Sequence, residues 1–360
     1  MSTVRRLADA AGSQVLIGPS LAFELGSRLQ LTAHRAVIIS DSNVAPLHAD
    51  RVAAGLSTFD PVVLTMPAGE SHKTRETWAT LTDRLLALGL GRDAVVIALG
   101  GGVVGDVAGF VAATYLRGVP VVQVPTSLVA MIDASIGGKT GLDVPGGKNL
   151  VGAFHPPTHI AIDPLLLATL PQDELRAGLA EALKHGAIRD EDYFEAIAAA
   201  GAALLEPGAA ASPAMLALIE RSVAIKSAVV NADPREQGER KILNFGHTLG
   251  HAIEAESGYA LRHGEAVGIG MALEATLGEQ LGVTAAGTAE RIERVLLDLG
   301  LPSRTSLPPE ALLARTQSDK KRLAGAAAYA LPAAIGRFEQ WTTSVPDDVV
   351  ITLLRDYSWK

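Results

Sequence analysis

Three histidines and a glutamate in the second half of the chain have the side-chain types and the spacing needed to bind a metal ion. His247 and His251 are four residues apart, so in a helix they would share one face, and Glu254 would continue that stripe. His263 follows after a break at Gly258. Neutral imidazole is a common ligand of divalent metals, and zinc usually takes three or four such donors. The pattern predicts a metal site, although a helix with two hydrogen-bonded histidines and no metal would give the same spacing.

A second segment could complete the set of metal ligands. In the predicted helix around residues 180–186, Glu181 is followed by Lys184 and His185, and Glu181 could supply the remaining donor. The metal is not expected to serve a zincin-type hydrolase. Such enzymes have Glu directly after the first histidine of the pair, where this chain has Thr248.

The composition narrows the class of protein. A chain of 360 residues, of which 48% are hydrophobic, can form two domains of ordinary size. With 31 basic and 39 acidic residues the net charge is -8, which argues against general binding to nucleic acid or to anionic membranes. The absence of cysteine leaves His, Asp and Glu as metal ligands and fits a cytoplasmic enzyme. We expect neither a signal peptide nor a membrane-spanning segment.

A glycine-rich stretch, residues 100–106, follows the predicted strand 94–99 and has the glycine spacing of a dinucleotide-binding turn. Glycines there would let the backbone approach a pyrophosphate, and the next helix would present its amino-terminal amides. No acidic residue follows at the usual distance, so Asp41, just past the predicted strand 37–40, is the better candidate for a ribose hydroxyl. A glycine-rich turn without a ligand remains the alternative.

Three further loops carry groups suited to anionic ligands. The polar loop 67–73 offers Glu70 and Lys73 to the same nucleotide, or is a solvated turn. The loops 137–141 and 146–149 each combine glycines with one lysine, which suits a phosphate or a carboxylate. Neither is a Walker motif, because the glycine five residues upstream is missing.

The elements that must position these groups fall into two parts. Up to about residue 170, short apolar runs alternate with helical stretches, which predicts a Rossmann-like parallel sheet with helices on both faces. The expected strands are 14–18, 36–40, 61–66, 94–99 and 119–124, and the expected helices begin at Leu21, cover 74–88 and extend from 125 to 133. From residue 171 the chain is rich in Ala, Leu and Glu and predicts a mainly helical domain with one short strand near 329–335. We therefore expect an α/β domain over 1–170 and a helical domain over 171–360.

Several long motifs resemble one family. They are GGGVVGDVAGF at 100–110, PTSLVAMIDASIGGKTGLD at 125–143, GKNLVGAFHPP at 147–157, RAGLAEALKHG at 176–186, LNFGHTLGHAIE at 243–254 and HGEAV at 263–267. In these motifs the chain closely resembles the 3-dehydroquinate synthases, sugar phosphate cyclases of the shikimate pathway. The similarity extends from about residue 41 to 322.

The resemblance implies an NAD- and metal-dependent lyase with the two-domain dehydroquinate synthase-like fold. Its substrate would be 3-deoxy-D-arabino-heptulosonate 7-phosphate and its products 3-dehydroquinate and phosphate, a step of aromatic amino acid and chorismate biosynthesis. The reaction would run through transient oxidation by NAD, phosphate elimination, reduction and intramolecular aldol closure. A cytoplasmic homodimer that binds Zn²⁺, with Co²⁺ as an alternative, is also implied.

The resemblance further implies roles for individual residues. The metal ligands would be Glu181, His247 and His263, so that His251 would face the substrate instead of the metal. The residues implied to contact NAD are Asp41, Glu70, Lys73, Gly101, Gly102, Asp106, Thr126, Ser127, Asp133, Lys148, Thr169 and Glu174. The residues implied to contact the substrate are Arg117, Lys139, Lys148, Asn149, Lys184, Lys226, Arg240, Asn244 and His251, with either Lys320 or Lys321 at the phosphate.

Three other functions are open to the same residues. A related cyclase could act on a sugar phosphate that lacks the carboxylate, but Lys226 and Arg240 would then be buried cations without a counter-charge. A metal-dependent polyol dehydrogenase would leave Lys139 and Lys148 without a purpose. A non-catalytic NAD-binding relative should have lost a metal ligand or a motif lysine, and this chain has lost none.

Overall fold

The computed structural model describes residues 4–317 and 327–357 and divides the chain into two compact units. The first unit comprises the chain up to Leu170 together with Ala210–Asn231, and the second comprises Pro171–Ala209 and the chain from Ala232 onward. The segment Ala210–Asn231 thus groups with the first unit, although its helical, alanine-rich sequence resembles that of the second. The assignment of 1–170 to NAD binding and 171–360 to metal and substrate binding stays a prediction.

The first unit is built on a seven-stranded sheet with the strand order β1-β2-β9-β6-β5-β3-β4. All neighbours are parallel except β1 and β2, which form an antiparallel hairpin. The central strand β5 is buried along its whole length, as expected for a continuous apolar run covered on both faces. The strands are β1 (Arg5–Ala10), β2 (Ser13–Ile17), β3 (Arg35–Asp41), β4 (Val62–Met66), β5 (Ala94–Gly100), β6 (Val121–Pro125) and β9 (His159–Ile162).

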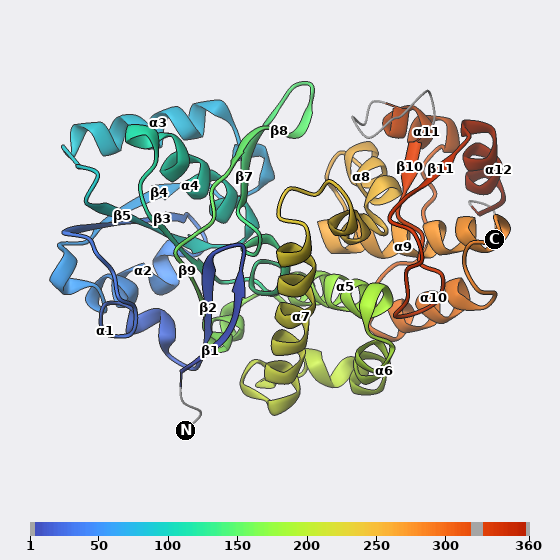
Figure 1. Ribbon diagram of the computed structural model, residues 1–360, viewed down its shortest axis with the longest axis horizontal. Helices are drawn as coiled ribbons and strands as arrows, with labels where there is room; N and C mark the ends of the chain where they lie inside the picture. Colours follow the sequence, from blue (N-terminus) through green and yellow to red (C-terminus); the bar gives the residue numbers. More distant parts are fainter. Residues whose placement is uncertain (1–3, 318–326, 358–360) are drawn as a thin grey trace. The chain divides into compact units, whose positions relative to one another are not determined.

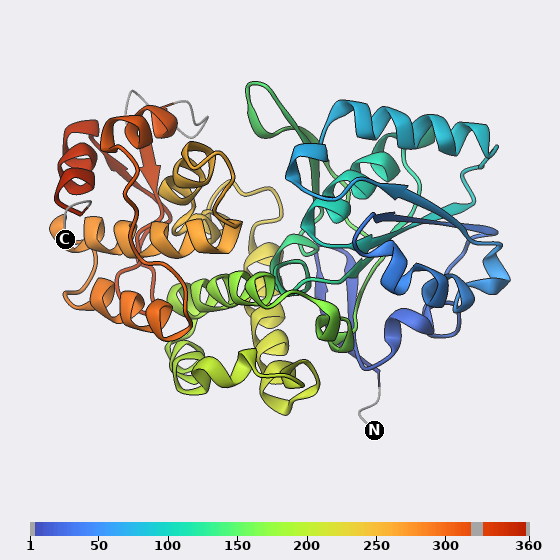
Figure 2. The ribbon, with the colours of Figure 1, turned by 180° about the vertical axis from the view of Figure 1, so that it is seen from behind.

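Helices cover both faces of this sheet (Figures 1 and 2). One face carries α3 (Arg75–Ala87) and α4 (Gly102–Thr114), and the other carries α1 (Leu25–Arg28) and α2 (Ala45–Ala54). Thr74 begins α3 as its N-cap, because its side chain accepts a hydrogen bond from the Thr77 amide. The Rossmann-like architecture predicted from the alternating pattern is therefore confirmed.

Helix α7 (Pro213–Ala232) is joined to the β1–β2 hairpin through Asn231. The Asn231 side chain accepts a hydrogen bond from the Ala11 amide at 2.8 Å and donates one to the Asp9 carbonyl at 2.6 Å. Ala11 and Gly12 form the tight turn between the strands and both have positive φ. The contact explains why α7 groups with the first unit.

Several sequence predictions about individual elements were wrong. The two glycine–lysine loops are the start of β7 (Lys139–Val144) and of β8 (Gly147–Phe154), which pair as an antiparallel hairpin. Their many glycines concealed the alternation on which a strand prediction depends. The helix expected from Leu21 is one 3₁₀ turn followed by the short α1. Of the predicted strand 329–335, only Tyr329 lies in a strand, β10 (Ala327–Tyr329), which pairs with β11 (Thr343–Val345), and the chain turns beyond it.

The second unit is a bundle of helices packed around α9. Helix α9 contacts α5, α8, α10 and α12, and it is buried almost throughout because small and apolar residues occupy most of its faces. Leu249, Leu273 and Tyr329 belong to the hydrophobic core of this unit. The helices are α5 (Gln172–Arg189), α6 (Glu191–Ala200), α8 (His247–Glu256), α9 (His263–Gln280), α10 (Thr288–Asp298), α11 (Pro309–Gln317) and α12 (Asp347–Tyr357).

Glycines allow the backbone of α9 to contact the backbones of two of its neighbours, α5 and α8. A Cβ added to Gly264 would lie 2.0 Å from the carbonyl oxygen of Ala177 in α5. A Cβ added to Gly270 would lie 2.0 Å from the carbonyl oxygen of Gly246, the N-cap of α8. No other residue fits at these positions without moving the helices, so glycine fixes how closely α5, α8 and α9 approach.

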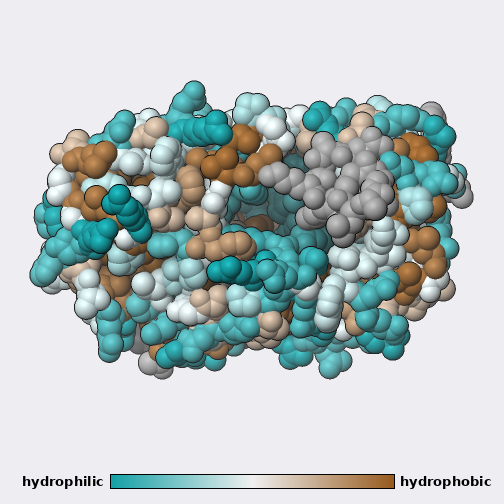
Figure 3. Space-filling view, turned by 45° about the horizontal axis from the view of Figure 1, so that its top comes forward, coloured by the Kyte–Doolittle hydropathy of each residue, from teal (hydrophilic) through white to brown (hydrophobic). Residues whose placement is uncertain are grey.

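Within the described residues, no helix is both long and apolar enough to cross a membrane. On the face shown in Figure 3, hydrophobic residues lie in small groups among hydrophilic ones.

Candidate metal centre and cofactor site

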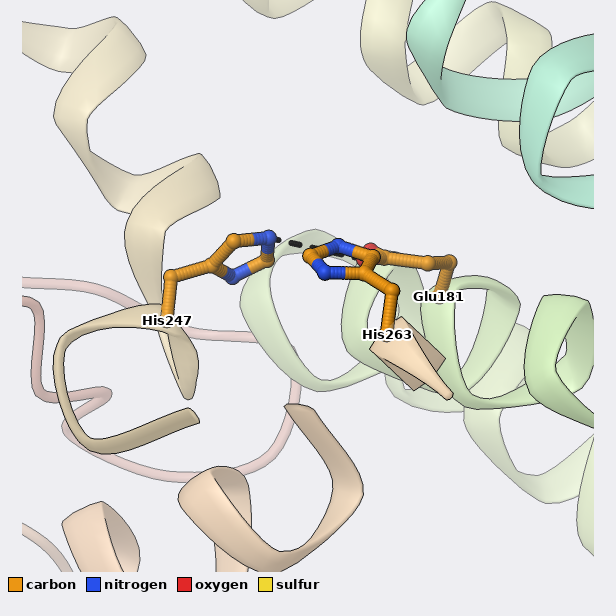
Figure 4. Close-up of side chains that lie close together, drawn as sticks. All are labelled: Glu181, His247 and His263. Atoms are coloured by element: carbon orange, nitrogen blue, oxygen red, sulfur yellow. Dashed lines mark hydrogen bonds and ion pairs between the residues drawn. The ribbon is translucent and has the colours of Figure 1, made fainter. Parts of the chain in front are cut away.

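Three side chains, one from α9 and two from helices that pack against it, converge in the second unit. Glu181 comes from α5, His247 from the first turn of α8 and His263 from the first turn of α9 (Figure 4). One donor atom from each lies within 4.8 Å of the other two. Glu181 Oε1 is 3.4 Å from His247 Nε2 and 3.1 Å from His263 Nε2. One carboxylate oxygen and two imidazole nitrogens thus face a common point.

Each of these donors is held by a further contact. Lys184 Nζ lies 2.6 Å from the second carboxylate oxygen of Glu181, and His247 Nδ1 lies 3.1 Å from the Phe245 carbonyl oxygen. His263 Nδ1 lies 3.6 Å from Glu254 Oε2. A partner on the second imidazole nitrogen fixes the tautomer and the ring orientation, as is typical of metal-binding histidines.

The electrostatics of this cluster favour a cation. Burial opposes ionisation of Glu181, but Lys184 and the two histidines outweigh it and hold the pKa of Glu181 well below its usual range. Burial and Lys184 lower the pKa of His247, which leaves that imidazole neutral and able to bind a metal. Burial also disfavours the charged form of His263, yet hydrogen bonds to Glu181 and Glu254 raise its pKa to about 10. The carboxylates of Glu181 and Glu254 thus favour a positive charge at this point, and either a proton or a metal ion can supply it.

The donor set fits a divalent transition metal. Zinc in catalytic sites is typically held by three His or carboxylate ligands, with further coordination left for water or substrate. Among the described residues, Glu181, His247 and His263 form the only group of three or more acidic, histidine or cysteine side chains that converges in this way. The site is therefore a candidate metal centre.

His251 lies one turn after His247 on α8 and is not part of the converging donors. Its ring centroid is 5.2 Å from that of His247 and 5.8 Å from that of His263. The helical spacing correctly placed both α8 histidines on one face, but the third donor comes from α5, and Glu254 contacts His263 instead of joining the donors. The simple prediction from the helical stripe was wrong on Glu254 and His251.

Other predicted substrate residues of the second unit are partly occupied by internal contacts. Arg240 is almost completely buried and donates through Nη1 to the Pro234 carbonyl at 2.7 Å. The Asn244 side chain donates to Glu236 at 2.8 Å. Glu174, predicted to contact NAD, is exposed and lies 3.1 Å from Arg262. Lys320 and Lys321 lie outside the described residues.

The residues predicted to bind NAD in the first unit follow the carboxyl ends of parallel strands. In an open α/β sheet these ends form the ligand-binding edge, especially where successive helices change faces. Such a change occurs between α2, which follows β3, and α4, which follows β5. The predicted residues at strand ends are Asp41 as the last residue of β3, Glu70 and Lys73 after β4, Gly101 and Gly102 after β5, Thr126 and Ser127 after β6, and Thr169 after β9.

Lys73 is the centre of a polar network at this edge. Its ammonium lies 2.6 Å from Asp106 Oδ2 and 2.6 Å from Asn149 Oδ1, and Glu70 is 3.9 Å away. Burial alone would lower the pKa of Lys73, but the carboxylates of Asp106 and Glu70 raise it, so the ammonium stays charged. Lys148 reaches the same Glu70 at 3.1 Å. Four predicted cofactor residues and one predicted substrate residue therefore form one connected group.

In the glycine-rich turn, neighbouring side chains crowd Gly100 and Gly105 but leave space at Gly101. A Cβ on Gly100 would lie 2.6 Å from the Val104 side chain, so packing requires glycine there, whereas one on Gly105 would lie 2.8 Å from Gln123 Oε1, the end of a flexible side chain that would have to shift. A Cβ on Gly101, the N-cap of α4, would meet only Ser127 Oγ at 3.5 Å, an ordinary contact. Internal packing does not require glycine at 101, whereas close approach of a ligand to the helix amides would.

The remaining predicted residues of the first unit are dispersed. Lys226 on α7 is paired with Asp133, so its burial alone does not require an anionic ligand, and this argument for a carboxylated substrate was wrong for Lys226. Lys139 is exposed at the start of β7. Arg117 is exposed and has a φ of 67°, which only a constrained turn imposes on a non-glycine residue.

Sequence reasoning missed two residues that hold predicted site residues in place. Asp143 accepts from the Asn149 amide at 2.9 Å, and its own amide donates to the Lys73 carbonyl. His48 on α2 lies 2.8 Å from the Thr169 hydroxyl. Asp143 lies inside a quoted motif and could have been noticed as a carboxylate near Lys148, whereas nothing local to His48 indicated that it would meet a residue 121 positions away.

Solved structures similar to the whole chain include two cyclases. The 2-deoxy-scyllo-inosose synthase complexed with carbaglucose-6-phosphate, NAD⁺ and Co²⁺ has a TM-score of 0.88 and 25% identity, and the match covers 99% of this chain and 100% of the other. The 2-epi-5-epi-valiolone synthase from Streptomyces hygroscopicus subsp. jinggangensis 5008, with NAD⁺ and Zn²⁺ bound, has a TM-score of 0.85 and 31% identity over 99% and 98% of the two chains. The chain therefore has the dehydroquinate synthase-like fold of the sugar phosphate cyclases, and its converging donors could hold a divalent ion such as those in both neighbours.

Sequence comparison gives the family. The model for the 3-dehydroquinate synthase N-terminal region matches residues 63–177, and the model for the C-terminal region matches residues 178–322. A 3-dehydroquinate synthase from Xanthomonas axonopodis pv. citri (strain 306) is 47% identical over 356 residues, which cover 94% of this chain and 95% of the relative. The chain belongs to the 3-dehydroquinate synthase family.

Proposed function

We propose that this enzyme converts 3-deoxy-D-arabino-heptulosonate 7-phosphate to 3-dehydroquinate and phosphate, with NAD and a divalent metal, Zn²⁺ or Co²⁺, as cofactors. The overall sequence is oxidation, phosphate elimination, reduction and intramolecular aldol closure, so that NAD is regenerated in each cycle. The observation that carries the proposal is the convergence of Glu181, His247 and His263 in a chain that also keeps the family's motif lysines.

Glu181, His247 and His263 would hold the metal. When bound, it supplies a Lewis acid that lowers the pKa of a coordinated substrate hydroxyl. Lys184 keeps Glu181 anionic, and Glu254 holds the His263 ring through Nδ1, so both ligands are fixed before a metal arrives. His251, beside both imidazoles but outside the donor set, would exchange a proton with the substrate.

The first unit would bind NAD at the carboxyl edge of its sheet. Asp41 ends β3, but its Oδ1 already accepts from the amides of Asn43 and Val44, so a ribose hydroxyl would use Oδ2. The amino-terminal amides of α4 would take the pyrophosphate, with Gly101 leaving room for it. NAD, when bound, supplies a hydride acceptor that later returns the hydride.

Lys73 would determine how Asn149 presents its amide. The lysine ammonium is bonded to Asn149 Oδ1, so the amide NH₂ group is directed away from Lys73 and is left to donate to an acceptor on the substrate. The exposed ammonium of Lys139 would contact an anionic group of the substrate, as would Arg117. Either Lys320 or Lys321 is proposed to join them at the phosphate. Lys226, Arg240 and Asn244 complete the proposed substrate set.

A phosphate-release assay on the purified, zinc-loaded protein with the seven-carbon keto acid phosphate and NAD would test the function. We expect many phosphates released per NAD, with no net accumulation of NADH and with 3-dehydroquinate as the organic product. Net NADH without phosphate would contradict the proposal and favour a polyol dehydrogenase. Turnover only with a sugar phosphate that lacks the carboxylate would favour another cyclase of the class.

We further propose that the enzyme works in the cytoplasm as a homodimer and binds neither nucleic acid nor membrane. The net charge of -8 supports the absence of nucleic-acid and membrane binding, and the absence of cysteine supports the cytoplasm, whereas the homodimer rests on the family resemblance alone. The ranges 1–170 and 171–360 are proposed as the NAD-binding domain and the metal- and substrate-binding domain. Light scattering of the purified protein would test the dimer, and a monomeric mass at micromolar concentration would contradict it.

A further inference from the structure

Glu274 is a completely buried glutamate on α9, and its carboxylate faces the amino-terminal end of α8. Oε2 accepts a hydrogen bond from the Gly246 amide at 2.8 Å, and Oε1 accepts one from the Leu249 amide at 3.0 Å. Gly246 is the N-cap of α8 and Leu249 lies in its first turn. Glu274 therefore binds the backbone on both sides of His247.

Helix α8 needs a cap from outside its own sequence. The first amides of a helix have no partner within it, and a side chain at the N-cap usually accepts from one of them. Gly246 cannot be replaced by such a residue, because its φ is 76° and an added Cβ would lie 2.5 Å from Met271 Cγ and 2.9 Å from the Val267 carbonyl. Glu274 supplies the missing acceptor, and its negative charge is favourable at the positive end of the helix dipole.

The carboxylate thereby connects two helices that each carry a candidate metal ligand. His247 is the first residue of α8, between the two amides that Glu274 binds, and His263 is the first residue of α9, which bears Glu274. Glu274 lies three turns along α9 from His263, about 16 Å by helical rise, so it acts on the metal centre through the α8 backbone and is not itself a ligand.

We infer that Glu274 is a positioning residue that sets where His247 stands relative to His263. The inference rests on the metal centre proposed above. Loss of the carboxylate would free the first turn of α8 to shift, which separates the His247 and His263 donors. Residues that orient metal ligands typically change metal affinity about 10- to 100-fold when they are removed.

The chain offers a matched control on the same helix. Glu279 is also a glutamate of α9, and it also accepts from the first turn of a neighbouring helix, the Ala289 amide of α10, at 2.8 Å. Helix α10 carries none of the converging donors. Glu279→Gln therefore removes a helix cap made by a glutamate of the same helix, while leaving the contact between Glu274 and the start of α8 unchanged.

The test measures metal binding directly, without turnover. Purified apoprotein of the full chain would be titrated with Zn²⁺ and Co²⁺ against a chelating dye, and the Co²⁺ form would be examined by visible absorption. We expect Glu274→Gln to weaken Zn²⁺ binding about 10- to 100-fold and to change the Co²⁺ bands, because a carboxamide cannot accept from both amides. Glu274→Asp, which keeps the charge on a shorter side chain, should lie between Glu274→Gln and the unchanged chain.

The outcomes separate this inference from the proposed function. If the unchanged chain binds neither ion, the metal centre is refuted and the role of Glu274 with it. If the unchanged chain binds metal and Glu274→Gln binds it equally well with the same Co²⁺ spectrum, only the role of Glu274 is refuted. An equal loss of affinity in Glu279→Gln would also refute it, since the effect would then be general destabilisation. Should Glu274→Gln not fold, Glu274→Asp is compared with Glu279→Gln by the same criteria.

Discussion

The two units place reactive groups by different means. In the first unit most of the proposed cofactor residues lie at or just beyond the carboxyl ends of five strands, and polar side chains such as Lys73, Asp106 and Asn149 hold one another. In the second unit the metal donors project from three helices whose spacing depends on glycine contacts such as that between Gly264 and Ala177. A sheet edge therefore presents a broad surface to a large cofactor, whereas a tight helix crossing defines one point for a small ion.

The difference predicts how each unit tolerates change. At the sheet edge, a substitution at a position that internal packing leaves open, such as Gly101, should alter binding with little effect on folding. At the helix crossing, the same close packing holds the metal donors in place and stabilises the fold. Substitutions near the metal centre should therefore affect both metal binding and stability.

Removing one metal donor should have the largest effect. We expect His263→Ala to lose both its equivalent of zinc and at least about a thousandfold of its activity, because two donors cannot hold the ion. Metal analysis after dialysis and the phosphate-release assay measure the two losses. The matched variant is His251→Ala, which should keep its zinc and lose turnover, since His251 is outside the donor set. A full equivalent of zinc in His263→Ala would refute its role.

Enlarging a glycine distinguishes the two units directly. Gly264→Ala should lower the free energy of unfolding by about 3 kcal/mol, because the methyl group would overlap the Ala177 carbonyl and force α9 away from α5. Gly101→Ala should cost about 0.5 kcal/mol or less but weaken NAD binding about tenfold, since its methyl would project only toward the ligand side. Denaturant unfolding and NAD titration measure the pair. Equal stability losses would contradict the comparison.

Removing the exposed ammonium of Lys139 tests the surface character of the first unit. We expect Lys139→Ala to lower kcat/KM for the sugar phosphate about 100-fold while the NAD dissociation constant and the unfolding midpoint stay nearly unchanged, because the side chain contributes charge and not packing. Arg92→Ala, which removes another exposed cation of the same unit, serves as the control. Unchanged kinetics would exclude Lys139 from the substrate set.

A smaller effect is expected from pH at His48. Burial, with a further contribution from Arg51, lowers the pKa of His48 below its usual value. The folded chain then binds fewer protons at this ring than the unfolded chain does, so His48 makes stability decrease as pH falls through about 6.5. His48→Gln should remove less than about 1 kcal/mol of this decrease, measured by unfolding at about pH 8 and about pH 5.5. Exposed His34→Gln is the control, and an unchanged pH slope in His48→Gln would count against the effect.

The sequence predicted the architecture better than the geometry of the sites. Alternating apolar runs placed β3, β4, β5 and α3 within a few residues, because burial on both faces of a sheet leaves a clear pattern. The same reasoning failed for β7 and β8, where glycines interrupt the pattern and pairing with a partner strand decides the structure.

The metal centre shows a limit of local reasoning. Spacing indicated that His247 and His251 share a helix face, but it could not show that Glu181, 66 residues earlier, would meet His247 and not His251. That choice depends on how α5 and α8 each pack against α9. The contacts of Gly264 and Gly270 determine this packing in three dimensions. Only the resemblance to a family supplied the three residues together, and no local signal indicated His48.

Helix α7 has a consequence for how the chain folds during synthesis. The polypeptide passes between the two units at three points, after Leu170, after Ala209 and after Asn231, so neither unit is one continuous stretch of sequence. When the ribosome has completed residue 170, Ala11 and Asp133 still lack Asn231 and Lys226, which are made about 60 residues later. The first unit therefore cannot finish folding before the segment Pro171–Ala209 of the second has been translated. A fragment that ends at residue 170 is an incomplete nascent intermediate with an uncovered surface where α7 belongs.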